Sequence, residues 1–212
     1  MTRVETTTQL RMQRRAARRE ANRTQILDAA EQVFARVGVH NGSMREIAAE
    51  AGFSSAAIYL FFENRQDLVA QTLMRRVDEL VALIADTIDA SSEPLSAMHT
   101  IVDETLAFHD RRRDFWTVLT QVRSGTTMLA SELGVHADEA DERFLAIEAM
   151  LTRLVRSGQR KGTIRRGNPR VLARFYMVLN NEYIITNLNG DGASPAEFHA
   201  FLDDAFAPAR PG

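Results

Sequence analysis

The chain has 212 residues, 45% of them hydrophobic and none of them cysteine, so it can bury a core but excludes disulfides, thiolate metal sites and cysteine nucleophiles. Its net charge of −2 hides an asymmetry: residues 1–65 carry ten arginines against seven acidic residues, and residues 66–212 carry a net charge of −5. A basic end on an acidic body favours a polyanionic partner at that end.

No membrane-spanning segment is expected, because the sequence lacks a run of roughly 18 apolar residues. The arginine-rich N-terminus is not followed by the apolar stretch of a secretory signal. Together with the absence of cysteine, this predicts a protein of the reducing cytoplasm with no membrane partner.

Residues 1–21 form a basic arm that we expect to be disordered, because its side chains can bury too little apolar area to offset the ordering entropy. Its clustered arginines are Arg11, Arg14, Arg15, Arg18 and Arg19. These side chains could become ordered on DNA, at phosphates or in a neighbouring minor groove, or could belong to a solvated tail.

The first amphipathic helix is predicted to begin at Asn22, where Gln25 completes a helix-start pattern, and to end at Gly38. Its apolar stripe consists of Ile26, Ala29, Ala30, Val33, Phe34 and Val37. We expect this stripe to pack beneath the next two helices and to form a small core with Ile47, Ile58 and Phe62.

Residues 43–68 indicate two short helices, a tight turn and the start of a longer helix. Ser43 and Glu46 have the spacing of a capping box, and Gly52 supplies the backbone freedom that a turn after a helix requires. Ser54 is the next candidate N-cap, ahead of a short helix predicted over 55–61. Two helices joined by a glycine-containing turn are typical of a helix-turn-helix, whose second helix enters the DNA major groove.

The segment from Arg23 to Val69 contains RTQILDAAEQVFARVG, then SMREIAAEAGFS, then IYLFFENRQDLV. In this order and spacing it resembles the DNA-binding domain of the TetR family of transcriptional regulators. The resemblance implies an all-α protein with an N-terminal three-helix DNA-binding domain over 22–66 and a helical ligand-binding and dimerisation domain over 67–212.

The resemblance also implies which residues contact DNA: Ser54, Ser55, Ala56, Ala57, Tyr59 and Leu60 in the recognition helix, with Ser43, Arg45 and Arg65 at phosphates. Many family members have Lys, Gly or Thr where this chain has Ser-Ala-Ala at 55–57. Few long polar side chains therefore remain to read bases, and discrimination would rest on thymine-methyl contacts, bridging waters, Arg45 and DNA shape.

The remainder of the chain is predicted to be helical. A fourth helix runs from Asn64 to Ala90 without a flexible linker, so it would connect the two domains rigidly. Near the C-terminus, the helix beginning at Pro169 is apolar on two sides, and the final helix has one stripe that consists of Phe198, Phe201, Leu202, Ala205 and Phe206. Such surplus apolar faces predict a homodimer through the two C-terminal helices, and the resemblance implies the same.

A small-molecule effector is implied by the resemblance, and its pocket would be lined by aromatic, methionine and amide side chains from several helices. The candidates are Phe108, Trp116, Leu119, Gln121, Met128, Met150, Phe175, Tyr176 and Asn180. Each could equally be an ordinary core residue, because such side chains at helical spacing usually pack in a core.

No metal or cofactor is expected. His99 with Asp103 has the spacing of neighbours on one helix face, but there is no thiolate and no third donor close in sequence. The arginines at 111–113 could recognise an anion or could form a solvated helix end.

The function predicted from these observations is that of a homodimeric, ligand-responsive transcriptional repressor that binds a palindromic operator and is released by a small apolar or amphipathic effector. An enzyme is not expected, because the chain has no P-loop, dinucleotide loop, nucleophile elbow or zinc signature. The alternatives are a non-specific DNA-binding dimer and a partner-binding module with a weakened recognition helix.

Overall fold

A computed structural model describes residues 3–124, 127–128, 133 and 136–208. It confirms the all-α class. The helices are α1 (Arg3–Val37), α2 (Met44–Glu50), α3 (Ser55–Ile58), α4 (Arg65–Ala90), α5 (Pro94–Arg111), α6 (Arg113–Gln121), α8 (Ala137–Lys161), α9 (Pro169–Leu188) and α10 (Pro195–Phe206). Two-residue strands, β1 (Arg123–Ser124) and β2 (Thr127–Met128), pair antiparallel after α6.

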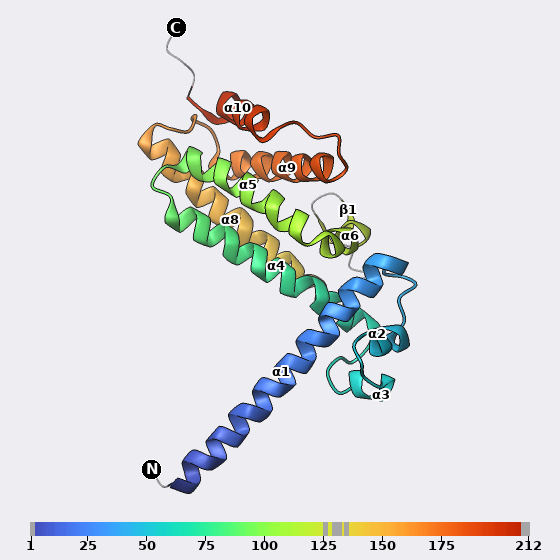
Figure 1. Cartoon of the computed structure of the whole chain (residues 1–212). Coiled ribbons are helices and arrows are strands. Elements are labelled where there is room, and N and C mark those ends of the chain that lie inside the picture. The colour runs from blue at the N-terminus through green and yellow to red at the C-terminus, as the bar shows by residue number, and fades with distance from the viewer. Residues whose placement is uncertain (1–2, 125–126, 129–132, 134–135, 209–212) are drawn as a thin grey trace.

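The N-terminal region, which we call the head, consists of α2, α3 and the C-terminal half of α1, packed against the start of α4 (Figure 1). Its predicted core is confirmed. The fully buried side chains are Ile26, Ala30, Val33, Phe34, Ile47, Ile58 and Phe62. Both short helices thus rest on one amphipathic face of α1, as the helical spacing of these residues requires.

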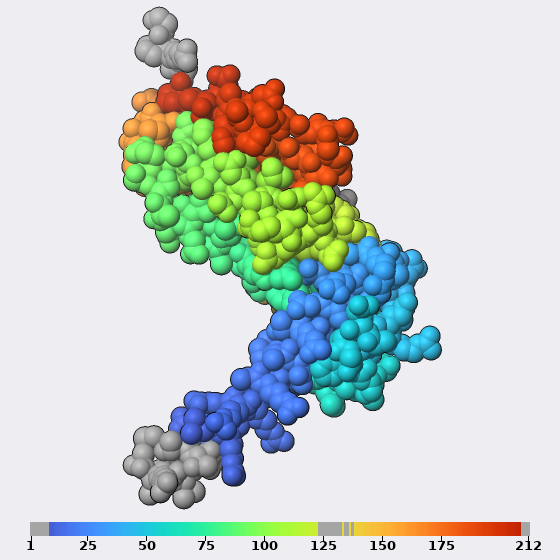
Figure 2. Space-filling view, viewed as in Figure 1, coloured from blue at the N-terminus to red at the C-terminus, as the bar shows by residue number. Residues whose placement is uncertain are grey.

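The arm over 1–21 differs from the sequence expectation, because α1 is continuous from Arg3 and Asn22 lies within the helix. The physical reason is local: residues 9–21 are mostly Arg, Ala, Gln, Leu and Met, which are strong helix formers, and they include no Gly or Pro. Residues 9–21 remain exposed, and this part of α1 projects away from the rest of the molecule (Figures 1 and 2).

Helix α4 connects the head to the remainder of the chain, which we call the body (Figure 1). The Asn64 side chain caps it by accepting a hydrogen bond of 2.9 Å from the Asp67 backbone N–H. Leu68 and Leu73 are buried in the head core, whereas Ile84 belongs to a second core cluster in the body. One uninterrupted helix therefore contributes to both cores.

The body packs α4, α5, α8 and α9 together, and α10 lies across α5 and α9 (Figure 1). The stripe of the final helix is covered within the chain at Phe198, Leu202 and Phe206, whereas Phe201 of the same stripe is 49% exposed. Phe198 stacks on Tyr183 of α9, with ring centroids 4.1 Å apart. For α10 this burial favours cover from the same chain, because an apolar stripe does not specify whether its cover comes from the same chain or from another. The homodimer through the two C-terminal helices stays a prediction.

Among the described residues, no helix is both long and apolar enough to cross a membrane.

Candidate functional site

The exposed end of the head is formed by α2, a tight turn and α3. Ser43 Oγ accepts from the Glu46 N–H at 3.2 Å, and the Ser43 N–H donates to Glu46 Oε2 at 3.1 Å. The hydrogen bonds from Ser43 hold the pKa of Glu46 below its usual value. Gly52 adopts a φ of +71°, and Ser54 Oγ then caps α3 at the Ala57 N–H, at 3.2 Å. The predicted caps and turn are therefore confirmed.

Helix α3 is shorter than predicted, ending at Ile58, but it presents the expected residues outward. Ser54, Ser55 and Ala56 are exposed and Ala57 is half-buried. The side chain of Ile58 is fully buried, so it fixes the helix on the head core. Beside it, Tyr59 is 56% exposed and Leu60 is 72% exposed. A large aromatic and a large aliphatic side chain next to a capped helix form a surface suited to an external partner.

The expected phosphate-contacting residues differ in their surroundings. Arg45 is exposed, and Ser43 is half-buried in its capping box. Arg65, at the start of α4, is also half-buried, and its Nη1 donates to the Val39 carbonyl oxygen. This bond ties α4 to the loop after α1, while the guanidinium retains further N–H donors.

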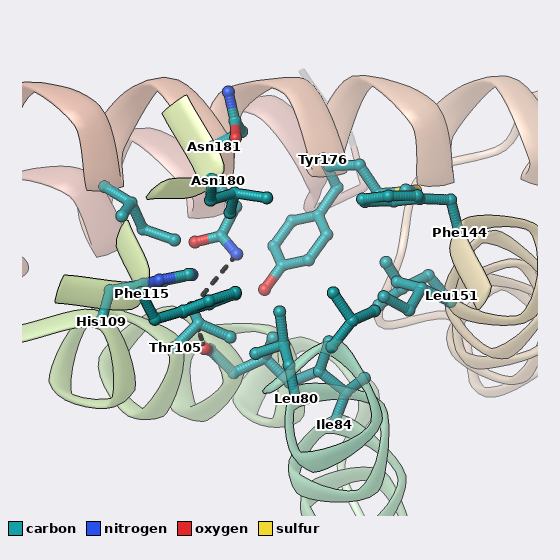
Figure 3. Close-up of a pocket in the computed structure, with 16 residues that line it drawn as sticks. Leu80, Ile84, Thr105, His109, Phe115, Phe144, Leu151, Tyr176, Asn180 and Asn181 are labelled. Atoms are coloured by element: carbon teal, nitrogen blue, oxygen red, sulfur yellow. Dashed lines mark hydrogen bonds between the residues drawn. The ribbon is translucent and has the colours of Figure 1, made fainter. Parts of the chain in front are cut away.

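A cavity of about 90 Å³ lies in the body between α4, α5, α6, α8 and α9 (Figure 3). Its walls are predominantly apolar. The lining residues are Val77, Leu80, Ile84, Ile101, Thr105, His109, Phe115, Leu119, Phe144, Ile147, Leu151, Tyr176, Met177, Asn180, Asn181 and Ile184. A space of this size can hold several water molecules or a small organic group.

A few polar groups converge on the cavity. The Tyr176 hydroxyl donates to the Met98 carbonyl oxygen at 2.7 Å, and burial raises the pKa of this phenol well above its usual value. Asn180 Nδ2 donates to Thr105 Oγ1 at 3.2 Å, as Figure 3 shows. Asn180 Oδ1 is buried and has no hydrogen-bond partner within the described part of the chain. An unused acceptor beside a cavity is a natural position for a ligand donor group.

Three of the predicted pocket residues, Leu119, Tyr176 and Asn180, line this cavity. Phe108 and Trp116 are buried behind its wall, where both pack edge-on against His109, with ring centroids 5.5 Å and 4.7 Å away.

The other candidates lie elsewhere, since helical spacing does not fix how a helix is rotated against its neighbours. Gln121 accepts from the Val39 N–H of the head at 2.7 Å, and Phe175 is 59% exposed. Met150 lines a surface depression beside α4, and the Met128 side chain lies outside the described residues.

The sequence did not identify His109, Phe115 and Thr105 as cavity residues. Thr105 and His109 belong to the apolar stripe of α5, and Phe115 belongs to the apolar face of α6. Their helical spacing predicted that they are buried, but it could not predict that they border a cavity. Within the described ranges, no group of three or more potential donors is arranged to bind a metal ion. His99 instead lies 3.0 Å from Asp203 of α10, and His199 lies 3.0 Å from Asp103 of α5.

The head and the cavity share packing residues. Phe115, Leu119 and Ile184 line the cavity and also belong to the same hydrophobic cluster as Phe34 and Ile47 of the head. Ion pairs reinforce the junction: Arg112 lies 2.6 Å from Glu79 of α4, and Arg76 lies 2.8 Å from Glu79 and 2.9 Å from buried Glu31 of α1. A change in the cavity wall can therefore reach the head through direct contacts.

Residues 26–72 match a family model described as bacterial regulatory proteins, tetR family. The chain is also 35% identical over 81 residues to HdnoR, a nicotine-responsive transcriptional repressor of Paenarthrobacter nicotinovorans. That match covers 38% of this chain and 42% of HdnoR, so it spans less than half of the relative.

Solved structures extend the similarity to the body. A transcriptional regulator from Saccharomonospora viridis, in complex with choline, has a TM-score of 0.72 at 25% identity and matches 87% of this chain and 95% of that one. FadR from Bacillus subtilis, in complex with stearoyl-CoA, has a TM-score of 0.70 at 17% identity, with 85% and 95% covered. The second likeness is one of fold alone.

Proposed function

We propose, on the premise that this chain belongs to the TetR family of regulators, that it is a transcriptional repressor that a small molecule releases from DNA. It binds a palindromic operator as a homodimer, because a two-fold assembly presents two recognition helices to two half-sites. The observation that carries the proposal is the exposed pair Tyr59 and Leu60 beside capped α3, on a head whose own core is closed.

The DNA contacts proposed for this head are those expected from the sequence. Ser55, Ala56, Ala57, Tyr59 and Leu60 face the major groove, with Ser54 at the start of the helix. The proposed phosphate contacts are made by Ser43, Arg45 and Arg65. Arg65 has a second role, because its bond to Val39 also positions α4.

The test is selection of a bound sequence from random duplexes, followed by filter binding with competitor DNA. A specific repressor prefers its palindrome to random DNA by about 10³-fold or more. Equal affinity for random DNA would favour a non-specific DNA-binding dimer, and no DNA binding would favour a partner-binding module. Arg65→Ala should reduce the magnitude of the salt slope by about 0.9 per half-site, since the variant neutralises one phosphate fewer.

The effector proposed for the cavity is a small apolar or amphipathic molecule with one hydrogen-bond donor for Asn180 Oδ1. Pockets for drug-sized ligands are typically about 300–1,000 Å³. The cavity of about 90 Å³ is well below this range. A chain as long as that of the stearoyl-CoA bound by FadR would therefore require the wall to repack.

Choline and stearoyl-CoA are suitable first probes for thermal shift and for release of operator DNA, followed by small apolar amides and alcohols. An effector should raise the melting temperature of the protein and weaken operator binding. Asn180→Leu removes the free acceptor and should abolish that response with little change in operator affinity. A response that survives this substitution would place the effector elsewhere.

The proposed dimer interface is the outer face of α8 and α9. Leu145 of α8 and Val171, Phe175 and Val178 of α9 are large apolar side chains, each between 44% and 59% exposed. A stable interface buries about 1,200–2,000 Å² in total. Phe175→Arg should produce a monomer in analytical ultracentrifugation, whereas Phe201→Arg on α10 should leave the dimer intact.

A further inference from the structure

The exposed N-terminal part of α1 carries a basic stripe that the helix-turn-helix does not account for. Its arginines are Arg11, Arg14, Arg15, Arg18 and Arg19. In a helix, the spacings of three, four, seven and eight residues from Arg11 place these side chains on one face. Glu20 is the one acidic residue over 9–21, and it lies 3.7 Å from Arg23, below the stripe.

The base of this segment is fixed beside the recognition helix. Arg19 Nη2 lies 3.5 Å from the Leu60 carbonyl oxygen, and its guanidinium lies 5.9 Å from the centroid of the Phe61 ring. One turn further along, the Arg23 guanidinium lies 5.7 Å from the Phe62 ring, and Arg23 also donates to Gln71 of α4. The arginine stripe therefore begins next to the residues that we propose face DNA. Because α1 is one continuous helix, the packing of its C-terminal half in the head sets the direction in which its N-terminal part projects (Figures 1 and 2).

We propose that this stripe, the basic arm helix, is a second DNA-binding surface that contacts phosphates of the duplex flanking each half-site. From Arg11 to Arg19 the helix rises about 12 Å, at ~1.5 Å per residue. That length corresponds to about three to four base pairs at ~3.4 Å each. A helix of about 10–12 Å diameter cannot enter a minor groove that is ~6 Å wide. The arginines therefore contact the DNA backbone, and these contacts do not depend on the base sequence.

The composition of the arm favours DNA over a lipid surface. Helices that lie in a membrane interface carry Trp, Phe or Leu along the face opposite their basic residues. Residues 9–21 of the arm include no aromatic residue. Three of their five apolar residues are the small Ala16, Ala17 and Ala21. Arginine is also well suited to phosphate, since its planar guanidinium can donate two parallel hydrogen bonds.

The inference rests on the proposed DNA-binding function, so the experiment uses three duplexes. The first contains the selected palindrome alone, the second extends it by about ten base pairs on each side, and the third is random DNA of the same length as the second. The arm variant replaces Arg11, Arg14, Arg15 and Arg18 by Ala, which preserves helix propensity. A control of equal charge change replaces exposed Arg111, Arg113, Arg153 and Arg160 by Ala.

The arm variant should bind the extended and random duplexes about tenfold or more weakly, and the magnitude of its salt slope should fall by ~0.9 for each phosphate that is no longer neutralised. Its binding to the short duplex, and all binding by the control, should match that of the wild type. Replacing the same four arginines by Lys should retain most of the affinity, since the cations remain.

Unchanged affinity and salt slope for the arm variant on the extended and random duplexes would overturn the inference while leaving the operator function intact. Failure of the wild type to select any palindrome would instead overturn the repressor proposal. The random duplex would still test the arm in that case, because phosphate contacts do not depend on sequence.

Discussion

The head of this chain has a closely packed core, whereas the core of its body contains a cavity. In the head, Phe34, Ile47 and Ile58 are completely buried, and both short helices are capped by serine side chains within three residues. The body instead retains a cavity bordered by Asn180 Oδ1, an acceptor that has no hydrogen-bond partner among the residues that the structure describes. A region that must hold a fixed surface toward a partner benefits from close packing, whereas a region that senses a molecule needs space that the molecule can fill.

The largest expected effect is in the head. Phe34→Ala removes a fully buried ring, and such truncations cost about 3–5 kcal/mol. The matched change in the body, Phe144→Ala, should cost less than half as much, because this side chain is half-buried and already borders the cavity. Urea unfolding followed by circular dichroism measures both. Equal losses would remove the contrast between the two regions.

A smaller loss is expected within the cavity wall. Tyr176→Phe removes the buried hydroxyl that donates to Met98, which should cost about 1–2 kcal/mol since the loss of one partner leaves the other less satisfied. Tyr59→Phe is the matched control, because its hydroxyl is on an exposed residue and its removal should leave the unfolding midpoint unchanged. If Tyr176→Phe left the free energy of unfolding unchanged, the stability of the cavity wall would not depend on this hydrogen bond.

The caps of the head should contribute next. Ser43→Ala removes the acceptor for the Glu46 N–H and should cost about 1 kcal/mol, the usual contribution of an N-cap. Ser43→Thr retains the hydroxyl and should recover most of that loss. If both variants unfold at the wild-type denaturant concentration, the α2 start is fixed by core packing and not by its cap.

The smallest effect is a pH dependence in the body. Arg174 and Arg170 donate to Glu148 and lower the pKa of its carboxyl. A carboxylate with a lowered pKa in the folded state stabilises the protein above its unfolded pKa, and the stabilisation disappears as the pH falls through the folded value.

Wild-type protein should therefore exceed Glu148→Gln in stability at neutral pH by less than about 1 kcal/mol, since both arginines are largely exposed. The difference should vanish in acid, as measured by thermal unfolding from pH 7 to pH 3. The control is Asp204→Asn, at an exposed carboxylate of α10, which should show no such trend. A difference that persists in acid would indicate a steric cause.

The parts of the structure that the sequence predicts well are specified by neighbours in the chain. Ser43 with Glu46, and Ser54 with Ala57, interact within three residues, so spacing alone identifies them. The stripe of α1 succeeds for the same reason, because a single face of one helix determines its core.

The cavity is less predictable because it depends on how five helices are rotated against one another. His109 lines it while adjacent Phe108 packs behind it, and both are buried, so one step along α5 separates wall from core. Similarly, α9 and α10 both have apolar stripes, yet only contact with α5 and α9 shows that Phe198 is covered within the chain. The rotation of the helices and their contacts with one another are properties of the folded chain, and they leave no pattern in the sequence.

The position of Trp116 has a spectroscopic consequence. It is the one tryptophan of the chain, 9% exposed, and its indole ring lies 4.7 Å from the His109 imidazole, which forms part of the cavity wall. A molecule that enters the cavity and shifts this imidazole should alter the quenching of indole emission. The protein thus contains its own optical reporter of occupancy, readable by intrinsic fluorescence without any added dye.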